Sequence, residues 1–516
     1  MASDPRSPRR RVASAGGQRG ARSGSSDGLG GGSQKSSGKR QRPHGDGRKG
    51  SGRSSPRPSG RQAKEVPDGA ERLAPRTGRE VAAVVLHRVC SQGAFAMRAL
   101  DATIQRAGLD ERDGALATEI VYGTLRVLPA IDARLAPRVR RGLGQTDPLT
   151  LAVLRAAVYQ LQHLGRLPVH AIVDEAVGFV RTTRSVQSAG FVNAVLRREA
   201  EERPRDPQPP DRVMFPAWLQ AALQASLGAA RASAFCAPRA FPPPLCLAVA
   251  DRNAEEWVER LRMQLPSAQV SAGALSPLSV VLRRSGDVRR LAAYEAGGFW
   301  VQEEGAQLVA LAVEPQAGER IGDLCAGHGG KSLCLQALRG GEGPLTAVDV
   351  DETKLSHIER EFVRLGFSAQ QLELAPVDLT VGSGGISPLF DRVLVDAPCS
   401  GLGTVARRPE LLLRVTPDDP LRFQALQARI VRHASELVRD GGHLFVAVCS
   451  PLKEEGVELA ARLLVENPAL EMLAADVSRL GILADDDKVL RIGPWLGRGD
   501  SVPDAYQVLR FAVRRI

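Results

Sequence analysis

Apolar residues recur every three to four positions between about residues 76 and 205, which is the period of a helix with one buried face. The pattern is clearest at 81–86 and 149–164, and turn-forming residues such as Gly108 and Pro168 separate the apolar runs. The order of hydrophobic and polar positions therefore predicts an all-α bundle over residues 76–205.

The pattern changes after a stretch rich in Pro and Asp at 203–210. Over residues 206–299 it mixes helical and extended segments, which predicts a small α+β domain of the ferredoxin-like kind. The expected helices are 218–227 and 254–265, and the expected strands are 245–249 and 279–282. From residue 300 to 516, short apolar runs alternate with helical patterns, which is typical of a doubly wound, mostly parallel sheet. The chain is thus predicted to be multi-domain and to end in a Rossmann-like α/β domain.

Charge is concentrated at one end of the chain. Residues 1–75 hold 17 Lys+Arg and 6 Asp+Glu, whereas the other 441 residues hold 52 of each. This segment is rich in Gly, Ser, Arg and Pro and has too few large apolar residues to offset the entropy lost on ordering. We expect a disordered basic tail. It either concentrates the protein on nucleic acid by attraction to phosphate or is a solvated extension, and the sequence leaves both open.

The 7 cysteines are widely scattered and none forms a Cys-x-x-Cys pair. This predicts neither a disulfide framework nor a metal site, and it fits a reducing cytoplasm. No run of about 18 apolar residues indicates a membrane span, and the first residues lack the apolar core of a signal peptide. We therefore expect a cytoplasmic protein, with no membrane contact and no bound metal.

Two of these cysteines, Cys399 and Cys449, each follow a short apolar run that predicts a buried strand, at 393–395 and 444–448. In an open α/β sheet, a thiol at the carboxyl end of a strand faces the crevice where such sheets bind ligands. Asp396 precedes Cys399 in an Asp-Ala-Pro-Cys sequence. A free cysteine is often a small core residue. Two thiols and an acid directed at one crevice instead predict covalent chemistry on an electrophilic ring.

A glycine-rich turn at 321–332 follows a predicted strand and opens a predicted helix. Glycines let backbone N–H groups approach a ligand, and a helix N-terminus favours an anionic group. Asp349 ends the next strand, where an acid can bind a ribose diol, and Asp378 ends the third, where it can face an adenine. Asp349 could instead cap the following helix, although Asp351 fits that role better. These features predict S-adenosylmethionine or a dinucleotide. The missing Gly-x-Gly-x-x-Gly pattern disfavours a dinucleotide oxidoreductase.

Together these motifs resemble the RNA cytosine-C5 methyltransferases. The segments that carry this resemblance are 323–331, 396–401 and 448–450. The segments 109–126, 157–161, 168–177 and 190–198 further resemble the NusB-like domain of the RsmB (Sun/Fmu) family, and 301–306 resembles the start of that family's catalytic domain. The resemblance covers everything except the tail. It implies methylation of carbon 5 of a cytosine in small-subunit (16S) ribosomal RNA, with S-adenosylmethionine as the methyl donor, and we expect a monomer.

The resemblance also implies roles for individual residues. Cys449 adds to carbon 6 of the base, Cys399 assists release, Asp396 binds the cytosine edge, and Lys331 supplies positive charge. DNA methyltransferases use a Pro-Cys thiol as the nucleophile, so the reverse assignment of the thiols stays open. His328 stands where the family usually has Pro. The residues expected to bind the cofactor are Cys325, Ala326, Gly327, His328, Gly329, Gly330, Lys331, Asp349, Asp378 and Asp396.

Two other functions stay open. The same chemistry could act on transfer RNA or another ribosomal cytosine, although relatives that act on other RNAs mostly lack the NusB-like domain. The chain could also be a catalytically silent RNA-binding assembly factor, although its candidate catalytic residues are all present. Two arginine clusters in the helical region allow an RNA-facing surface there. They are Arg134, Arg138, Arg140 and Arg141, and Arg181, Arg184, Arg197 and Arg198.

Overall fold

The structure is a computed structural model that describes residues 73–237, 241–387 and 389–515. The tail expected at 1–75 lies almost wholly outside the described residues. No helix within the described ranges is long and apolar enough to cross a bilayer.

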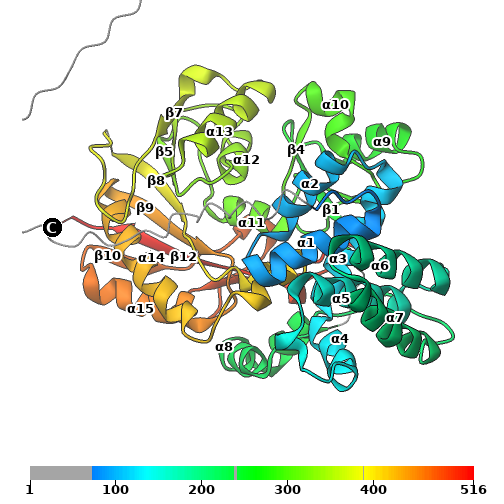
Figure 1. Cartoon of the computed structure of the whole chain (residues 1–516). Coiled ribbons are helices and arrows are strands. Elements are labelled where there is room, and N and C mark those ends of the chain that lie inside the picture. The colour runs from blue at the N-terminus through cyan, green and yellow to red at the C-terminus, as the bar shows by residue number, and fades with distance from the viewer. Residues whose placement is uncertain (1–72, 238–240, 388, 516) are drawn as a thin grey trace, which may run out of the picture. The chain divides into compact units, whose positions relative to one another are not determined.

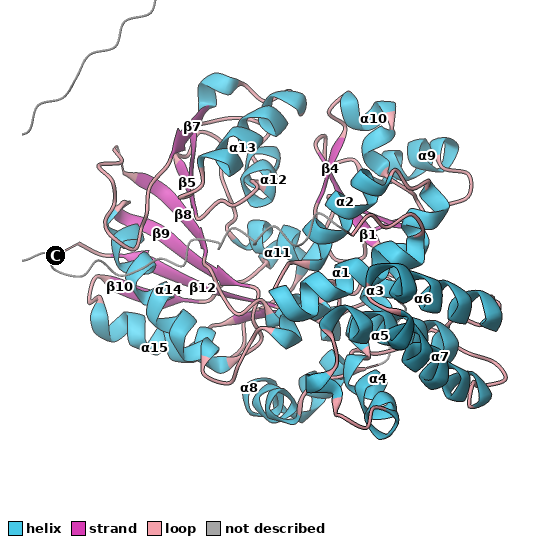
Figure 2. Cartoon of the chain, in the orientation of Figure 1, coloured by secondary structure: helices cyan, strands magenta, loops and turns pink. Residues whose placement is uncertain are grey.

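The N-terminal region is all-helical, as predicted (Figures 1 and 2). Its helices are α1 (Gly78–Gln92), α2 (Ala96–Ala107), α3 (Glu111–Arg126), α4 (Leu128–Leu135), α5 (Pro148–His163), α6 (Val169–Thr183) and α7 (Val186–Glu201). Thr77, Asp110, Asp147 and Ser185 begin four of them, and each side chain accepts a hydrogen bond from a backbone N–H of the first turn.

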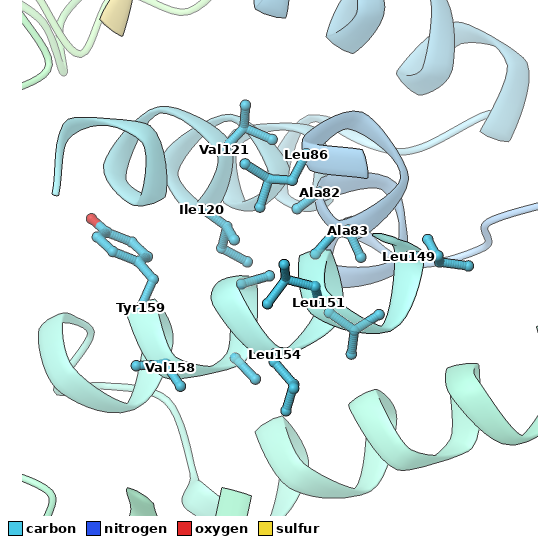
Figure 3. Packing of buried hydrophobic residues seen from close by; sticks show 14 of the residues in the cluster. Ala82, Ala83, Leu86, Ile120, Val121, Leu149, Leu151, Leu154, Val158 and Tyr159 are labelled. Atoms are coloured by element: carbon cyan, nitrogen blue, oxygen red, sulfur yellow. The ribbon is translucent and has the colours of Figure 1, made fainter. Parts of the chain in front are cut away.

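Helix α5 is the centre of this bundle and is buried along most of its length (Figure 3). Its Tyr159 is fully buried and donates a hydrogen bond to Glu119 Oε1 at 2.5 Å. Gly123 of α3 lets the two helices approach, because a Cβ at this position would lie 2.0 Å from the Tyr159 ring. The helical period seen in the sequence therefore reflects a bundle packed around α5.

The next domain has the β-α-β-β-α-β succession of ferredoxin-like folds. It contains β1 (Leu245–Val249), α9 (Ala254–Gln264), β2 (Gln269–Ala272), β3 (Ser279–Arg283), α10 (Ala292–Glu295) and β4 (Phe299–Val301). The antiparallel sheet has the order β2-β3-β1-β4. Strand β4 crosses the boundary expected at 299/300. Helix α8 (Ala217–Cys236) packs against the catalytic domain, where Leu219 and Leu223 share a core with Leu402 and Leu452.

The C-terminal region forms the predicted α/β domain. Its elements are α11 (Glu304–Ala312), β5 (Ile321–Leu324), α12 (Gly330–Leu338), β6 (Leu345–Val348), α13 (Glu352–Arg364), β7 (Leu372–Ala375), β8 (Phe390–Asp396), α14 (Asp419–Glu436), β9 (Val438–Val448), α15 (Val457–Glu466), β10 (Leu470–Leu473), β11 (Leu490–Ile492) and β12 (Tyr506–Val513). The strand order is β10-β12-β9-β8-β5-β6-β7, with β11 also paired to β12. The five neighbouring strands β9, β8, β5, β6 and β7 are parallel to one another. Strand β12 is antiparallel to β9, and β10 and β11 are antiparallel to β12.

The order of the strands fixes where a ligand can bind. From β5 the chain winds outward through β6 and β7, then returns to place β8 and β9 on the other side of β5. Helices α12 and α13 lie on one side of the sheet in Figure 1, and α14 and α15 lie on the other. The winding direction thus reverses between β5 and β8, and the carboxyl ends of strands at such a switch point border the binding crevice.

Contacts join the helical domain and the small domain to the catalytic domain. Glu410 Oε1 accepts a hydrogen bond from the Ala96 backbone at 3.3 Å, and the Arg414 guanidinium lies 3.9 Å from the centre of the Phe95 ring. Arg407 pairs with Asp504 at 3.1 Å and donates to the Pro244 carbonyl at 2.9 Å. The side chains near the catalytic crevice are therefore tied to both other domains.

Candidate active site

Three adjacent parallel strands deliver the predicted catalytic residues to one edge of the sheet. Strand β5 runs into the glycine-rich turn, β8 ends at Asp396, and β9 ends just before Cys449. Asp396 is in register with Ala447 of β9. Because these strands are parallel neighbours, the side chains that follow them converge at the switch point.

The two thiols meet there. Cys399 Sγ and Cys449 Sγ lie 3.1 Å apart, and both cysteines are free and half-buried. The hydrogen bond between the sulfurs, together with burial, raises the pKa of Cys399 well above its ordinary value. The two sulfurs are within hydrogen-bonding distance, and either of them can be the donor.

Lys331 and Asp396 form a second pair at the same edge. Lys331 Nζ lies 2.6 Å from Asp396 Oδ2, and the lysine side chain is 12% exposed. Burial alone would lower the pKa of Lys331, but the Asp396 carboxylate outweighs burial and raises it, with a smaller contribution from Cys449. The ammonium also lies 5.6 Å from the centre of the Tyr506 ring. Lys331 is thus a positive charge held by Asp396 at this edge of the sheet.

A buried carboxylate holds the two cysteine loops together. Glu455 is fully buried and accepts hydrogen bonds from Ser400 N at 2.9 Å, Ser400 Oγ at 2.5 Å and Gln427 Nε2 at 3.1 Å. Ser400 Oγ also lies 3.1 Å from Ser450 Oγ, so the residues that follow the two cysteines are linked. Burial raises the pKa of Glu455 although these donors oppose the shift. Glu455 thereby fixes the geometry of the thiol pair.

The glycine-rich turn presents backbone groups toward the crevice. Cys325, Gly327 and Gly329 have φ of 73°, 60° and 82°, in the left-handed region that favours glycine. Gly327 N donates to Asp349 Oδ2 at 2.9 Å, which fastens the turn to the end of β6. A Cβ at Gly327 would meet nothing within 4 Å, so the space beside this residue is open. The turn is therefore held in place and borders open space.

Two buried polar atoms near this turn have no hydrogen-bond partner among the described residues. Asp323 Oδ1 is an acceptor at the end of β5, and Gln302 Nε2 is a donor from a side chain next to Gly330. Unpaired buried polar groups are rare in folded proteins and call for an explanation. One acceptor and one donor beside the turn fit a ligand that carries both an ammonium and a carboxylate, as the methionine part of S-adenosylmethionine does.

The remaining predicted residues differ in their surroundings. Asp349 is buried and also pairs with Lys354 at 3.1 Å, while Asp351 caps α13, as expected. His328 is exposed at the surface. The part of its ring that is removed from water lowers its pKa, and the neighbouring His357 lowers it further. Burial raises the pKa of Cys325 to about 12, as expected of a packing residue whose backbone lines the turn.

The placement expected for Asp378 at the end of the third strand is wrong. Strand β7 ends at Ala375, so Asp378 lies in the loop beyond it. Its side chain is exposed and accepts hydrogen bonds from both Thr380 N and Thr380 Oγ1, at 2.8 and 2.7 Å. The Asp378 carboxylate, which was expected to face a ligand, instead accepts hydrogen bonds within a local turn, and such turns compete with extension of the strand.

The site contains residues that the sequence motifs did not single out. Glu455, Tyr506, Gln302 and the orphaned Asp323 oxygen all act through tertiary contacts. Gln302 and Asp323 lie in segments 301–306 and 323–331, which carried the resemblance without giving either residue a role. For Glu455 the signal was the Glu454-Glu455 pair soon after Cys449, since two acids next to a candidate nucleophile are unusual in a buried setting. Among the residues that the structure describes, no group of three or more His, Cys, Asp or Glu side chains could hold a metal.

A doubly wound sheet whose switch point carries a glycine-rich turn and paired thiols, joined to a helical bundle, is the architecture of a Rossmann-like methyltransferase with an added helical domain. A family model described as 16S rRNA methyltransferase RsmB/F matches residues 310–502, and a NusB family model matches 76–201. The chain belongs to this RsmB/F methyltransferase family, which confirms the resemblance seen in the sequence.

Individual relatives support this assignment. The chain is 31% identical to ribosomal RNA small subunit methyltransferase B of Pseudomonas putida, over 77% of this chain and 90% of that protein. It is 34% identical to the protein of the same name from Xanthomonas campestris, over 73% of this chain and 85% of that protein. The crystal structure of PH0851 is 20% identical, has a TM-score of 0.70 and covers 84% of this chain and 98% of its own, which supports the fold.

Proposed function

We propose that this protein transfers a methyl group from S-adenosylmethionine to carbon 5 of a cytosine in small-subunit (16S) ribosomal RNA, through a covalent bond between a cysteine and carbon 6. The observation that carries this proposal is the pair of thiols 3.1 Å apart, at the same edge as the Lys331–Asp396 pair. One thiol attacks the ring and the other assists its release. The relatives named ribosomal RNA small subunit methyltransferase B support the choice of RNA.

Cys449 is the nucleophile in this scheme. The Cys399 sulfur lies 3.1 Å from the Cys449 sulfur, and Lys331 supplies positive charge at the same edge of the sheet, the kind of setting in which cysteines act as nucleophiles. Carbon 5 of cytosine is a weak nucleophile. When the thiolate adds to carbon 6, a carbon–sulfur bond forms and the ring electrons shift so that carbon 5 becomes enamine-like. Asp396 faces the N3 and amine edge of the base. It accepts a hydrogen bond from the amine, and a proton held between its carboxyl group and N3 neutralises the negative charge that develops on the ring.

S-adenosylmethionine supplies an electrophilic methyl group when it is bound. The glycine-rich turn, Asp323 and Gln302 would hold its methionine part and Asp349 its ribose, and the contact of Asp378 with the adenine remains a prediction. After carbon 5 is methylated, its proton passes to a water molecule and the electrons of that carbon–hydrogen bond re-form the ring double bond. The carbon–sulfur bond breaks and its electrons return to Cys449 as the thiolate, with assistance from Cys399. The base must be unpaired to reach both thiols, so the target is flipped or single-stranded.

The test is methyl transfer from labelled S-adenosylmethionine to 16S ribosomal RNA by the wild-type protein, Cys449→Ala and Cys399→Ala. We expect 5-methylcytosine with the wild type and none with Cys449→Ala. Because Cys399→Ala can form the carbon–sulfur bond but releases it slowly, it should accumulate a denaturation-resistant protein–RNA adduct. If the adduct forms with Cys449→Ala instead, the roles of the thiols are reversed.

The same assay separates the other functions. Methylation of transfer RNA in place of 16S RNA would show that the chemistry is as proposed but that the substrate is transfer RNA. Failure of the wild-type protein to label any RNA, with retained RNA binding, would indicate a silent assembly factor.

A further inference from the structure

The helical domain contains a cavity of about 550 Å³ that belongs to none of the chemistry described above. It lies between the start of α5, one side of α7 and the loop that follows residues Ala136–Arg138. This volume is within the range of ligand-binding pockets. Its lining includes Arg140, Arg141, Arg198, Phe191, Ala194 and Val195.

The structure divides the arginine clusters of this domain into two groups. Arg134 and Arg138 both pair with Glu199 and Glu202, and Arg184 pairs with Asp147. These arginines are neutralised by structural ion pairs. Asp147, the acid that lines the cavity, also caps α5, because its side chain accepts a hydrogen bond from Thr150 N.

Three arginines at the cavity are left over. Arg140, Arg141 and Arg198 are exposed, and none of them forms an ion pair with any residue that the structure describes. They come from two separate segments of the chain and line the same cavity. Three unpaired guanidinium groups around one opening are suited to phosphate oxygens, which they bind in a bidentate manner.

The wall formed by α7 has an apolar stretch between the polar Gln187 and Ser188 and the basic Arg198. It presents Phe191, Ala194 and Val195, and Phe191 is half-buried. Aromatic side chains next to positive charge are the common means by which proteins bind unpaired nucleotides, because the base stacks on the ring while the backbone follows the charge. A base inside a concave pocket has left its helical stack, so duplex RNA does not fit.

We propose that this cavity binds a single-stranded segment of RNA, with one base against Phe191 and neighbouring phosphates on Arg140, Arg141 and Arg198. This inference rests on the proposed function in that RNA is the substrate. It adds a second contact on the RNA, away from the base that is methylated, which helps to select the RNA that the enzyme holds.

The test measures binding of a fluorescein-labelled single-stranded 12-nucleotide RNA to the full chain by anisotropy at several salt concentrations. The cavity variant carries Arg140→Ala, Arg141→Ala and Arg198→Ala. The logarithm of the binding constant falls with the logarithm of the salt concentration, with a slope of about 0.7 for each phosphate contact on a single strand. Loss of three contacts should therefore reduce this slope by about 2. We expect affinity to fall at least about tenfold at low salt, since each lost charge-assisted contact weakens binding.

The matched control carries Arg112→Ala, Arg181→Ala and Arg197→Ala. Like the cavity arginines, these are exposed residues of this domain without a described ion pair, but they do not line the cavity. The control removes the same charge, and we expect it to keep most of the affinity. Equal losses in the two triple variants would overturn the proposal, because general attraction to the surface would then explain the binding.

A second variant tests the stacking contact. Phe191→Leu keeps an apolar wall and removes the ring, and we expect about tenfold weaker binding of the single strand. Thermal melting verifies that each variant is folded. If the matched duplex binds as tightly as the single strand and Phe191→Leu changes nothing, the cavity does not hold an unpaired base.

The outcome can be separated from that of the proposed function. Methyl transfer to 16S RNA by the wild type, with the same KM for the cavity variant, would refute the cavity and leave the activity intact. Loss of RNA binding in the cavity variant, without methyl transfer by the wild type, would refute the activity and leave the cavity intact.

Discussion

Replacing Asp323 with Asn should stabilise the catalytic domain, and the gain should depend on pH. Asp323 is fully buried at the end of β5, where Ser332 Oγ donates to its Oδ2 at 2.5 Å and its Oδ1 has no described partner. Burial raises its pKa from 3.8 to about 6, although the Ser332 hydrogen bond opposes this. The side chain of Asn has nearly the same shape, can still accept from Ser332, and carries no charge.

The magnitude follows from the shift in pKa. An unfolded chain releases the Asp323 proton near pH 3.8 and the folded chain releases it near pH 6. Between these values the folded state binds more protons, so stability falls as pH rises, and the loss is complete above pH 6. A rise in pKa from 3.8 to about 6 corresponds to a loss of about 3 kcal/mol of stability at pH 8 and of about 1.6 kcal/mol at pH 5. Removing the charge should recover most of this difference.

The assay is thermal unfolding of wild type and Asp323→Asn without cofactor, from pH 5 to pH 8. For a domain of this size, about 1 kcal/mol shifts Tm by roughly 2–4 °C, so Asp323→Asn should melt about 6–12 °C higher at pH 8. At pH 5 the gain should be about half as large. Glu342→Gln is the control, because Glu342 is an exposed acid of the same domain. A Tm difference that is constant over the whole pH range, or a loss of stability at pH 8, would refute the reasoning.

Three further changes follow from contacts described above. Glu455→Ala leaves Ser400 and Gln427 without a buried acceptor, so the free energy of unfolding in denaturant should fall by about 2–4 kcal/mol. The same variant should have a lower kcat in methyl-transfer assays, and Glu455→Gln should retain part of both the stability and the activity. Gly123→Ala forces a methyl group into the buried Tyr159 ring and should cost about 1–3 kcal/mol, measured by helical circular dichroism during unfolding, while Gly178→Ala, with open space around its Cβ, should not. Diamide should abolish methyl transfer by joining the two site thiols, and dithiothreitol should restore it; an unchanged rate after treatment would contradict this.

The sequence predicted most of the architecture because its strands and helices carry strong local patterns. The strands before both thiols are continuous apolar runs buried on both faces, and β1 has the predicted bounds. Strand β2 was missed because, of its four residues, only Val270 is buried, so the segment lacks a clear period. Strand β4 was assigned to the catalytic domain because it directly precedes that domain, but its hydrogen bonds join it to β1.

The candidate site was predictable where one motif supplies a whole group of residues. The glycine-rich turn and the two cysteines follow strands directly, so the strand order alone brings them together. Glu455 could not be assigned in this way, because its role depends on three donors from two residues, Ser400 and Gln427, that reach it only in the folded domain. Asp378 was misplaced because a local hydrogen-bonded turn ended the strand earlier than the apolar pattern suggested.

Strand β12 has a consequence for how the enzyme is made. It lies between β9 and β10, its Gln507 donates to the Ser450 and Leu452 carbonyls beyond Cys449, and its Tyr506 lies close to Lys331. A ribosome synthesises β5, β8 and β9 well before it reaches this strand. During translation, the contacts that β12 makes beside Cys449 and Lys331 can therefore form only after the rest of the site has been synthesised. A nascent chain that stalls before residue 504 should carry every predicted catalytic residue and still lack an assembled site.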